Sequence, residues 1–76
     1  MAINEEKALL QLGKVIRNKR KELGYSQEDF ASVCDVHRTY IGSIERGERN
    51  ISFKNILGIA SALKIKSSEL LKLAKL

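Results

Sequence analysis

Residues Gln27 to Arg46 read QEDFASVCDVHRTYIGSIER, and this stretch decides the fold. Ser26, just before it, is a residue type that caps helices, and the Gln, Glu and Asp that follow are typical of a first helical turn. Apolar side chains then recur at helical spacing on both sides of a break near Asp35. They are Phe30, Ala31, Cys34, Val36, Ile41 and Ile44. The pattern predicts two short amphipathic helices joined by a tight turn.

The second of these helices keeps a hydrogen-bonding face on its outer side. Side chains of these types can meet a base edge or a phosphate. They are Arg38, Thr39, Tyr40 and Ser43. Two helices within about 20 residues, the second with such a face, form a helix-turn-helix layout. The sequence therefore indicates that the chain binds DNA.

Size and composition agree with one small domain over residues 1–76. The chain has 76 residues, of which 43% are hydrophobic, enough for a single core. Fourteen Lys and Arg against nine Asp and Glu give a net charge of +5, which favours polyanions, although many small soluble domains are also basic. The sequence has neither an apolar run of about 20 residues nor a signal-peptide pattern. From the lack of such a run we expect no membrane partner, and because the single Cys34 cannot form an internal disulfide, we expect a cytoplasmic protein.

Helical periodicity extends over the rest of the chain and predicts an all-α fold, a compact five-helix bundle. The first helix is expected from Asn4 or Glu5 to Leu23, ended by Gly24. The helix-turn-helix occupies about residues 26–47. Two C-terminal helices, within about residues 52–75, are expected to complete the core and to dimerise. Their expected caps are Ser52, before a helix that runs from Phe53 to about Leu63, and Ser67.

Three glycines fall inside expected helices, where each costs about 1 kcal/mol relative to alanine. They are Gly13, Gly42 and Gly58. Each is either a tolerated weak point or a place of close approach, of Gly13 or Gly42 to a neighbouring helix or to DNA and of Gly58 to a partner subunit.

Together with the pattern above, several residues resemble the phage-repressor-like helix-turn-helix family of small bacterial regulators. The resemblance covers about residues 9–71. It is carried by Ile16, Arg17, Arg20, Gly24, Ser26-Gln27-Glu28, Ala31, Tyr40-Ile41 and Ile44-Glu45-Arg46-Gly47. Within that family, the runs His37–Ile41, Ile44–Gly47 and Arg49-Asn50 are similar to the controller proteins of restriction–modification systems. Controllers of this type usually carry Asp before Arg-Thr-Tyr, where this chain has His37.

The resemblance implies a lambda-repressor-like fold and a homodimer on double-stranded DNA. Its operator would be palindromic, with one recognition helix from each subunit in successive major grooves. The protein would regulate its own promoter and that of a linked endonuclease gene. Activation would need contact with RNA polymerase. Glu28 and Asp29 are candidates for that contact, because activating repressors of this fold present acidic residues there.

The base-reading candidates are Arg38, Thr39, Tyr40 and Ser43. Arg38 can bind guanine through two hydrogen bonds, although a phosphate clamp or a solvated side chain is the alternative. For Tyr40 the alternative is partial burial against the preceding helix. Positions that match phosphate contacts in the family, or that lie where a phosphate can be reached, are Gln27, His37, Arg46, Arg49 and Asn50.

Other polar residues are interpreted as structural. By resemblance, Arg20 and Glu45 form an ion pair that holds the motif together. Cys34 and His37 are too few ligands for a structural zinc site, and no base or oxyanion pocket for nucleophilic catalysis accompanies them. We therefore expect no metal, no cofactor and no enzymatic activity.

The C-terminal helices have more apolar surface than a small monomer can readily hide. Some of these side chains must complete the core, and the remainder would form a two-fold interface. The candidates are Ile56, Leu57, Ile59, Ile65, Leu70 and Leu73.

Two other interpretations of the motif are an antitoxin and a phage-type repressor. Antitoxins usually add a flexible or partner-wrapping extension, and phage-type repressors normally carry a separate dimerisation or cleavage domain. Because almost no residues lie outside the expected domain, the regulator interpretation is preferred.

Overall fold

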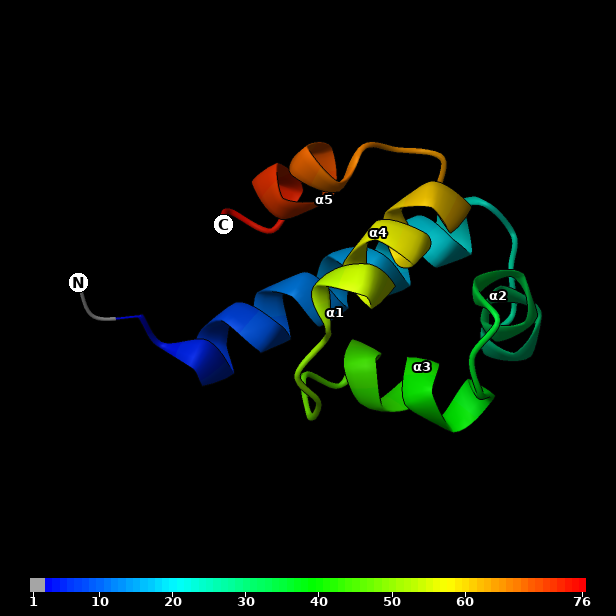
Figure 1. The fold of residues 1–76 in the computed structure, drawn as a ribbon, viewed down its shortest axis with the longest axis horizontal. Helices are drawn as coiled ribbons and strands as arrows, with labels where there is room; N and C mark the ends of the chain where they lie inside the picture. Colours follow the sequence, from blue (N-terminus) through cyan, green and yellow to red (C-terminus); the bar gives the residue numbers. More distant parts are fainter. Residues whose placement is uncertain (1–2) are drawn as a thin grey trace.

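Five helices follow one another in a computed structural model that describes residues 3–76 (Figure 1). They are α1 (Glu5–Glu22), α2 (Gln27–Cys34), α3 (Arg38–Glu45), α4 (Phe53–Ala62) and α5 (Ser67–Leu73). No strand occurs between residues 3 and 76, so the predicted all-α class is confirmed. The two helices expected around Asp35 are α2 and α3.

Polar side chains start most of the helices. The Asn4 side chain accepts a hydrogen bond from the Lys7 amide, and Ser26 and Ser52 accept from the amides three residues further on. The expected cap at Ser67 was wrong, because extended backbone at Lys66 makes that residue the cap and Ser67 the first residue of α5. Lys66 supplies no side-chain hydrogen bond, so α5 depends on its apolar contacts with the rest of the molecule.

The core is made by one apolar face from each helix, packed together. Its largest fully buried side chains are Phe30, Ile16, Ile41, Ile44, Ile59 and Leu70. Two of these, Ile59 and Leu70, were candidates for the dimer interface. They are only 2% and 0% exposed, so the structure removes them from that set.

Helices α1 and α3 come into backbone contact at Gly13. A Cβ atom there would lie 2.3 Å from the Ile44 carbonyl oxygen and 2.8 Å from that of Glu45. Gly13 is therefore a close approach and not a tolerated weak point. By contrast, a Cβ at Gly58 would meet nothing within 4 Å.

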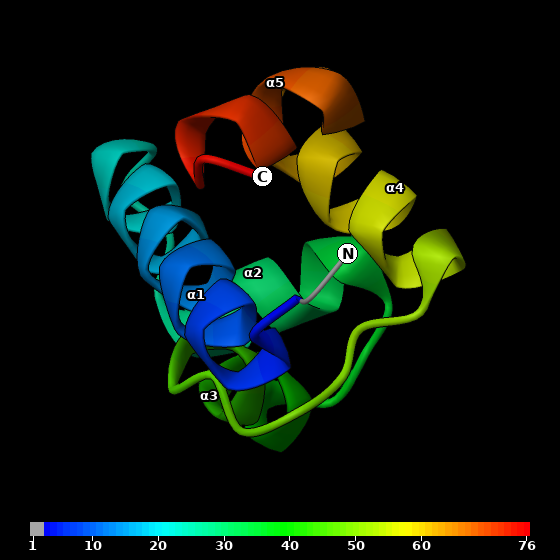
Figure 2. The ribbon, with the colours of Figure 1, turned by 90° about the vertical axis from the view of Figure 1, so that its left-hand side faces the viewer.

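The arrangement leaves one side of α3 uncovered. In two views at right angles, α3 lies at the lower edge of the molecule and α5 at the upper edge, with α1 between them (Figures 1 and 2). The loop that follows α3, drawn yellow-green, runs beside the same lower edge. Helix α3 and this loop therefore lie on one side of the fold.

Candidate nucleic-acid interface

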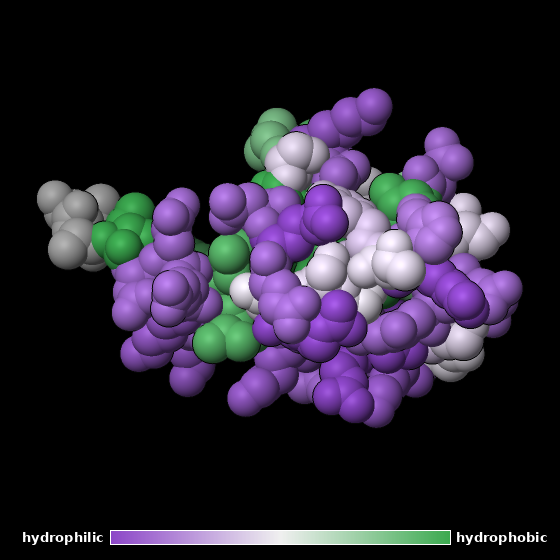
Figure 3. Space-filling view, turned by 90° about the horizontal axis from the view of Figure 1, so that it is seen from below, coloured by the Kyte–Doolittle hydropathy of each residue, from purple (hydrophilic) through white to green (hydrophobic). Residues whose placement is uncertain are grey.

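The uncovered side of α3 starts at its N-terminal cap. His37 Nδ1 accepts a hydrogen bond from the Thr39 amide at 3.1 Å, and the Thr39 hydroxyl oxygen lies 2.8 Å from the same nitrogen. The His37 side chain therefore caps α3, while Arg38 and Thr39 remain exposed. Seen from below, this side of the molecule is mostly hydrophilic (Figure 3). Such a surface suits contact with a wet, charged duplex.

Arg38 has one weak partner in the protein. Its Nη1 lies 3.5 Å from Glu28 Oε2 in the first turn of α2, and both side chains are largely exposed. Exposed ion pairs of this kind contribute only about 0–1 kcal/mol. The pair therefore orients Arg38 without preventing it from turning toward a base.

Tyr40 is half-buried, and it contacts α4 and the loop before α4. Its hydroxyl oxygen accepts a hydrogen bond from Asn55 Nδ2 at 2.8 Å, and the Arg49 guanidinium carbon lies 5.2 Å from the ring centroid. Ser43 Oγ donates to the Tyr40 carbonyl oxygen at 2.8 Å, so this hydroxyl uses its proton within α3. Ser43 can then act toward DNA only as an acceptor.

A buried ion pair joins α1 to α3, as the resemblance implied. Arg20 Nε and Nη2 donate to the two carboxylate oxygens of Glu45 at 2.6 and 3.1 Å, and Arg20 Nη1 donates to the Tyr25 carbonyl oxygen. Gln27 Nε2 also donates to Glu45, at 3.0 Å. Within residues 3–76, no buried side-chain polar atom lacks a partner. Arg20 is thus occupied in the protein, whereas Gln27 lies beside the recognition helix with one amide proton still free.

The loop after α3 supplies the remaining phosphate candidates. Arg46, Arg49 and Asn50 are all exposed, and Arg46 Nε lies 3.1 Å from Glu48 Oε2. Gly47 turns the chain with φ at +72°, and a Cβ there would lie 2.8 Å from a Leu10 methyl carbon. The loop therefore needs glycine at this position to pack against α1.

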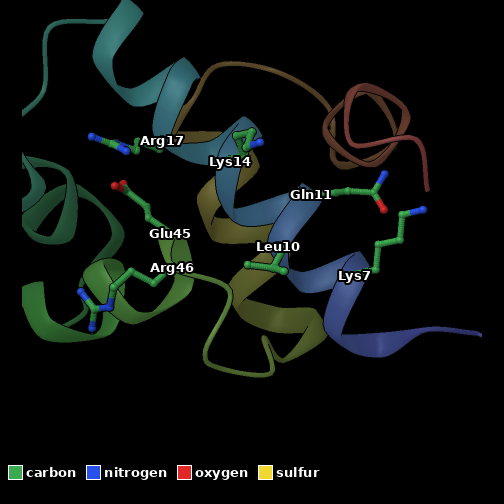
Figure 4. Close-up of a pocket in the computed structure, with 7 residues that line it drawn as sticks. All are labelled: Lys7, Leu10, Gln11, Lys14, Arg17, Glu45 and Arg46. Carbon is green, nitrogen blue, oxygen red and sulfur yellow. The ribbon is translucent and has the colours of Figure 1, made fainter.

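A shallow groove lies between α1 and the end of α3 (Figure 4). The periodicity of apolar residues in the sequence did not predict it. Its cationic residues are Lys7, Lys14, Arg17 and Arg46, beside Leu10, Gln11 and Glu45. The charge count indicated a basic surface but could not place it, because α1 and α3 meet only in the folded chain. The groove extends the positive charge beyond α3.

The remaining candidates are two acidic residues and a cysteine. Glu28 and Asp29 are exposed in the first turn of α2. Burial raises the pKa of the Cys34 thiol from 9.0 to about 11, so the thiol is neutral at ordinary pH. Over residues 3–76, no three His, Cys, Asp or Glu residues gather as metal ligands would. The same part of the chain forms no helix with the length and apolar character needed to span a membrane.

Helix α3 exposes hydrogen-bonding side chains, packs against the capped helix α2, and is held to α1 by the buried Arg20–Glu45 ion pair. This arrangement is that of a helix-turn-helix DNA-binding protein. The chain belongs to the helix-turn-helix family, whose pattern matches residues 16–75. It is a DNA-binding transcription regulator and not an enzyme.

Relatives narrow this assignment. The chain is 46% identical over 63 residues to control protein C.BamHI of Bacillus amyloliquefaciens, covering 82% of this chain and 78% of that protein. It is 44% identical over 62 residues to control protein C.MunI of a Mycoplasma species, covering 80% and 84%. The crystal structure of the restriction-modification controller protein C.AhdI from Aeromonas hydrophila superposes with a TM-score of 0.79 at 44% identity, covering 82% and 94%. The predicted resemblance to controller proteins is confirmed.

Proposed function

We propose that this protein is the controller of a restriction–modification system, acting as a homodimer on a palindromic operator. It would regulate its own gene and that of a linked endonuclease in the cytoplasm. The observation that supports this most is the uncovered α3 surface, where Arg38 and Thr39 are exposed and held by a cap at the helix start. The similarity to control proteins of such systems supports the genetic role.

In this proposal α3 enters the major groove with its first turn nearest the bases. Arg38 donates two hydrogen bonds to guanine, the commonest specific contact, once it leaves Glu28. Thr39 offers a methyl group to thymine or its hydroxyl oxygen as an acceptor, because the hydroxyl proton is directed at His37 Nδ1. Ser43 accepts a hydrogen bond, since its proton is used inside the helix. Tyr40 lies at the edge of this group, toward α4.

Phosphate contacts surround the base-reading group. The free amide proton of Gln27, together with the start of α2, suits a phosphate oxygen. His37 uses Nδ1 as the helix cap, which leaves Nε2 for a phosphate. Arg46, Arg49 and Asn50 hold the backbone from the loop after α3. These contacts fix the position of the protein, and the base contacts select the sequence.

Dimerisation falls to the outer sides of α4 and α5. The candidates that are not fully buried are Ile56, Leu57 and Leu73 on these helices and Ile65 in the loop between them, which packs partly against the core. Phe53 joins them, because it is 74% exposed at the start of α4 and lies one helical turn from Leu57. A palindromic operator requires such a dimer to hold its two recognition helices about 34 Å apart, one turn of DNA.

Activation would use the acidic start of α2 as the contact with RNA polymerase. Asp29 tests this better than Glu28, because Glu28 also pairs with Arg38. We expect Asp29→Asn to keep operator affinity and to lose activation in a purified transcription assay. Unchanged activation would exclude Asp29 as a necessary contact.

The experiment that tests the proposed function is selection of bound duplexes from a random DNA pool at fixed salt. It compares the wild type, Arg38→Ala and Lys72→Ala. Lys72 is the control, because its loss removes one positive charge from α5, on the opposite side of the molecule. We expect the wild type and the control to enrich one palindrome with half-sites about one helical turn apart, and Arg38→Ala to relax one base position.

The opposite outcome is equally specific. If no sequence is enriched and affinity only falls steeply with salt, binding is non-specific and the operator model is wrong. A partner-binding role such as that of an antitoxin would then be the better explanation.

A further inference from the structure

Asn55 connects the start of α4 to the recognition helix through a single side-chain contact. Its Nδ2 donates to the Tyr40 hydroxyl oxygen at 2.8 Å, across 15 residues of sequence. Asn55 is itself held in place, because its backbone amide donates to the capping hydroxyl of Ser52 at 3.2 Å. Both side chains are partly buried. The contact is therefore made from a fixed helical turn and not from a mobile loop.

The direction of this hydrogen bond determines what Tyr40 can do. A phenol can donate its one proton and also accept through its oxygen. Since the Asn55 amide donates, the phenol oxygen is the acceptor, and the phenol proton stays free for another acceptor. No hydrogen bond among residues 3–76 uses that proton.

The ring is also restrained on its face. The Arg49 guanidinium carbon lies 5.2 Å from the ring centroid, within the range of a cation–π contact. Arg49 is exposed in the loop beside α3, among the residues that we place on the operator backbone. The restrained phenol and this arginine thus belong to the same edge of the DNA-binding surface.

We propose that Asn55 is a positioning residue for DNA binding, which sets the Tyr40 phenol to donate its proton to a phosphate oxygen of the operator. The inference rests on the proposed function, because it needs a specific duplex against α3. Asn55 acts through Tyr40 and brings no charge of its own. The contact also makes the helix assigned to dimerisation part of the DNA-binding surface.

The contact itself can be tested without DNA. In nitrogen-15-labelled protein, the side-chain amide protons of Asn55 give their own NMR signals. We expect one of these signals to shift on Tyr40→Phe, which removes the acceptor. The side-chain amide signals of Asn18, an exposed residue of α1, should stay unchanged. Unchanged Asn55 signals would overturn the proposal before any DNA is added.

The role in binding is tested by a double-mutant cycle on the selected operator at fixed salt. We expect Tyr40→Phe to weaken binding roughly tenfold, as for a hydrogen bond to a charged group, and Asn55→Leu roughly threefold to tenfold. If Asn55 acts through the phenol, the double variant binds within about twofold of Tyr40→Phe alone. Penalties that multiply would overturn the proposal, since Asn55 would then act independently of Tyr40.

Further variants separate positioning from loss of structure. Asn55→Gln keeps an amide donor and should recover most of the affinity, and Asn18→Leu controls for the same chemical change elsewhere in a helix. The carboxylate introduced by Asn55→Asp would accept the phenol proton, so the proton would no longer be free for a phosphate. Asn55→Asp should therefore lower operator affinity much more in the wild-type background than in the Tyr40→Phe background. An equal Asn55→Asp penalty in both backgrounds would mean simple repulsion of DNA and would also overturn the proposal. Thermal unfolding of each variant checks that it is folded. If Asn55→Leu does not fold, the Asn55→Asp and Asn55→Gln variants decide whether Asn55 positions Tyr40.

Failure of the proposed function has a different signature. In that case the wild type selects no operator, whatever the NMR signals show, and the positioning role is rejected with it. If the wild type selects an operator and the cycle is multiplicative, only the positioning role is rejected.

Discussion

Glu45, the last residue of the recognition helix α3, joins three segments of the chain. Its carboxylate accepts hydrogen bonds from Arg20 on α1 and from Gln27 on α2, and Arg20 donates a further one to the Tyr25 carbonyl. Replacing a buried ion pair by apolar residues can be nearly neutral, but removing one partner leaves the other charge buried without compensation. The cost therefore depends on which change is made.

We expect Glu45→Gln to lower the free energy of unfolding by about 3 kcal/mol, because it strands the Arg20 guanidinium. Urea denaturation followed by circular dichroism measures this difference. Glu48→Gln is the matched control, since Glu48 pairs with Arg46 at 3.1 Å but is exposed, and its loss should cost less than about 1 kcal/mol. Equal losses for the two variants would contradict the interpretation of the buried pair.

Cys34 is expected to be slow to react. The thiolate is the nucleophile, and a pKa raised by burial from 9.0 to about 11 lowers the thiolate fraction roughly hundredfold at pH 8. Iodoacetamide labelling followed by mass spectrometry should therefore be that much slower in the folded chain than in the same chain in urea. Similar rates would show that the thiol is not held in an apolar environment.

The same shift has a sign for stability. Because the folded pKa lies above the unfolded value, the unfolded chain loses its thiol proton first as pH rises. The contribution of Cys34 to stability is thus complete below pH 9 and is lost as pH rises toward about 11.

At the scale of the helices, two glycines in helix interiors should respond in opposite ways to alanine. Gly13→Ala places a methyl group 2.3 Å from the Ile44 carbonyl oxygen, so α1 and α3 must separate, and we expect a loss of about 1–3 kcal/mol. Gly58→Ala meets nothing within 4 Å and should gain about 0.5–1 kcal/mol, because alanine favours the helix. Chemical denaturation of both variants gives the comparison. A stable Gly13→Ala variant would mean that the close approach is not needed.

Helical periodicity predicted all five helices, and capping residues located most of their starts. It could not decide which apolar residues of α4 and α5 are core, because those helices are apolar on more than one side. Ile59 is buried there, while Leu57 and Phe53 are exposed. Contacts such as Asn55 with Tyr40, or Glu28 with Arg38, join residues whose separation follows no helical period. They depend on how the helices pack, which no local pattern records.

At the scale of the whole molecule, the exposed side of α4 should hold the dimer together. We expect Leu57→Lys to weaken dimerisation at least tenfold, because it places a charge in an apolar interface without disturbing the core. Sedimentation over a range of concentrations measures the dissociation constant. Leu23→Lys is the control, since Leu23 at the end of α1 is 40% exposed against 44% for Leu57. Equal dissociation constants for the two variants would show that the dimer interface does not include the exposed side of α4.

The net charge is +5, and basic side chains lie both in the loop beside α3 and on α5 at the opposite side of the fold, so only part of them can meet DNA. Each phosphate neutralised by the protein contributes about −0.9 to the slope of log affinity against log salt concentration. Because Arg46 and Arg49 lie in the loop beside α3, Arg46→Gln with Arg49→Gln should flatten the slope by about 2 per subunit and about 4 per dimer.

Lys72→Gln, on α5, should leave the slope unchanged. Titrations of the operator at several salt concentrations test this, and equal slopes for all three proteins would mean that the loop after α3 does not contact the backbone. A variant with a flatter slope and an unchanged base preference would show that position and sequence are read by separate residues of one surface.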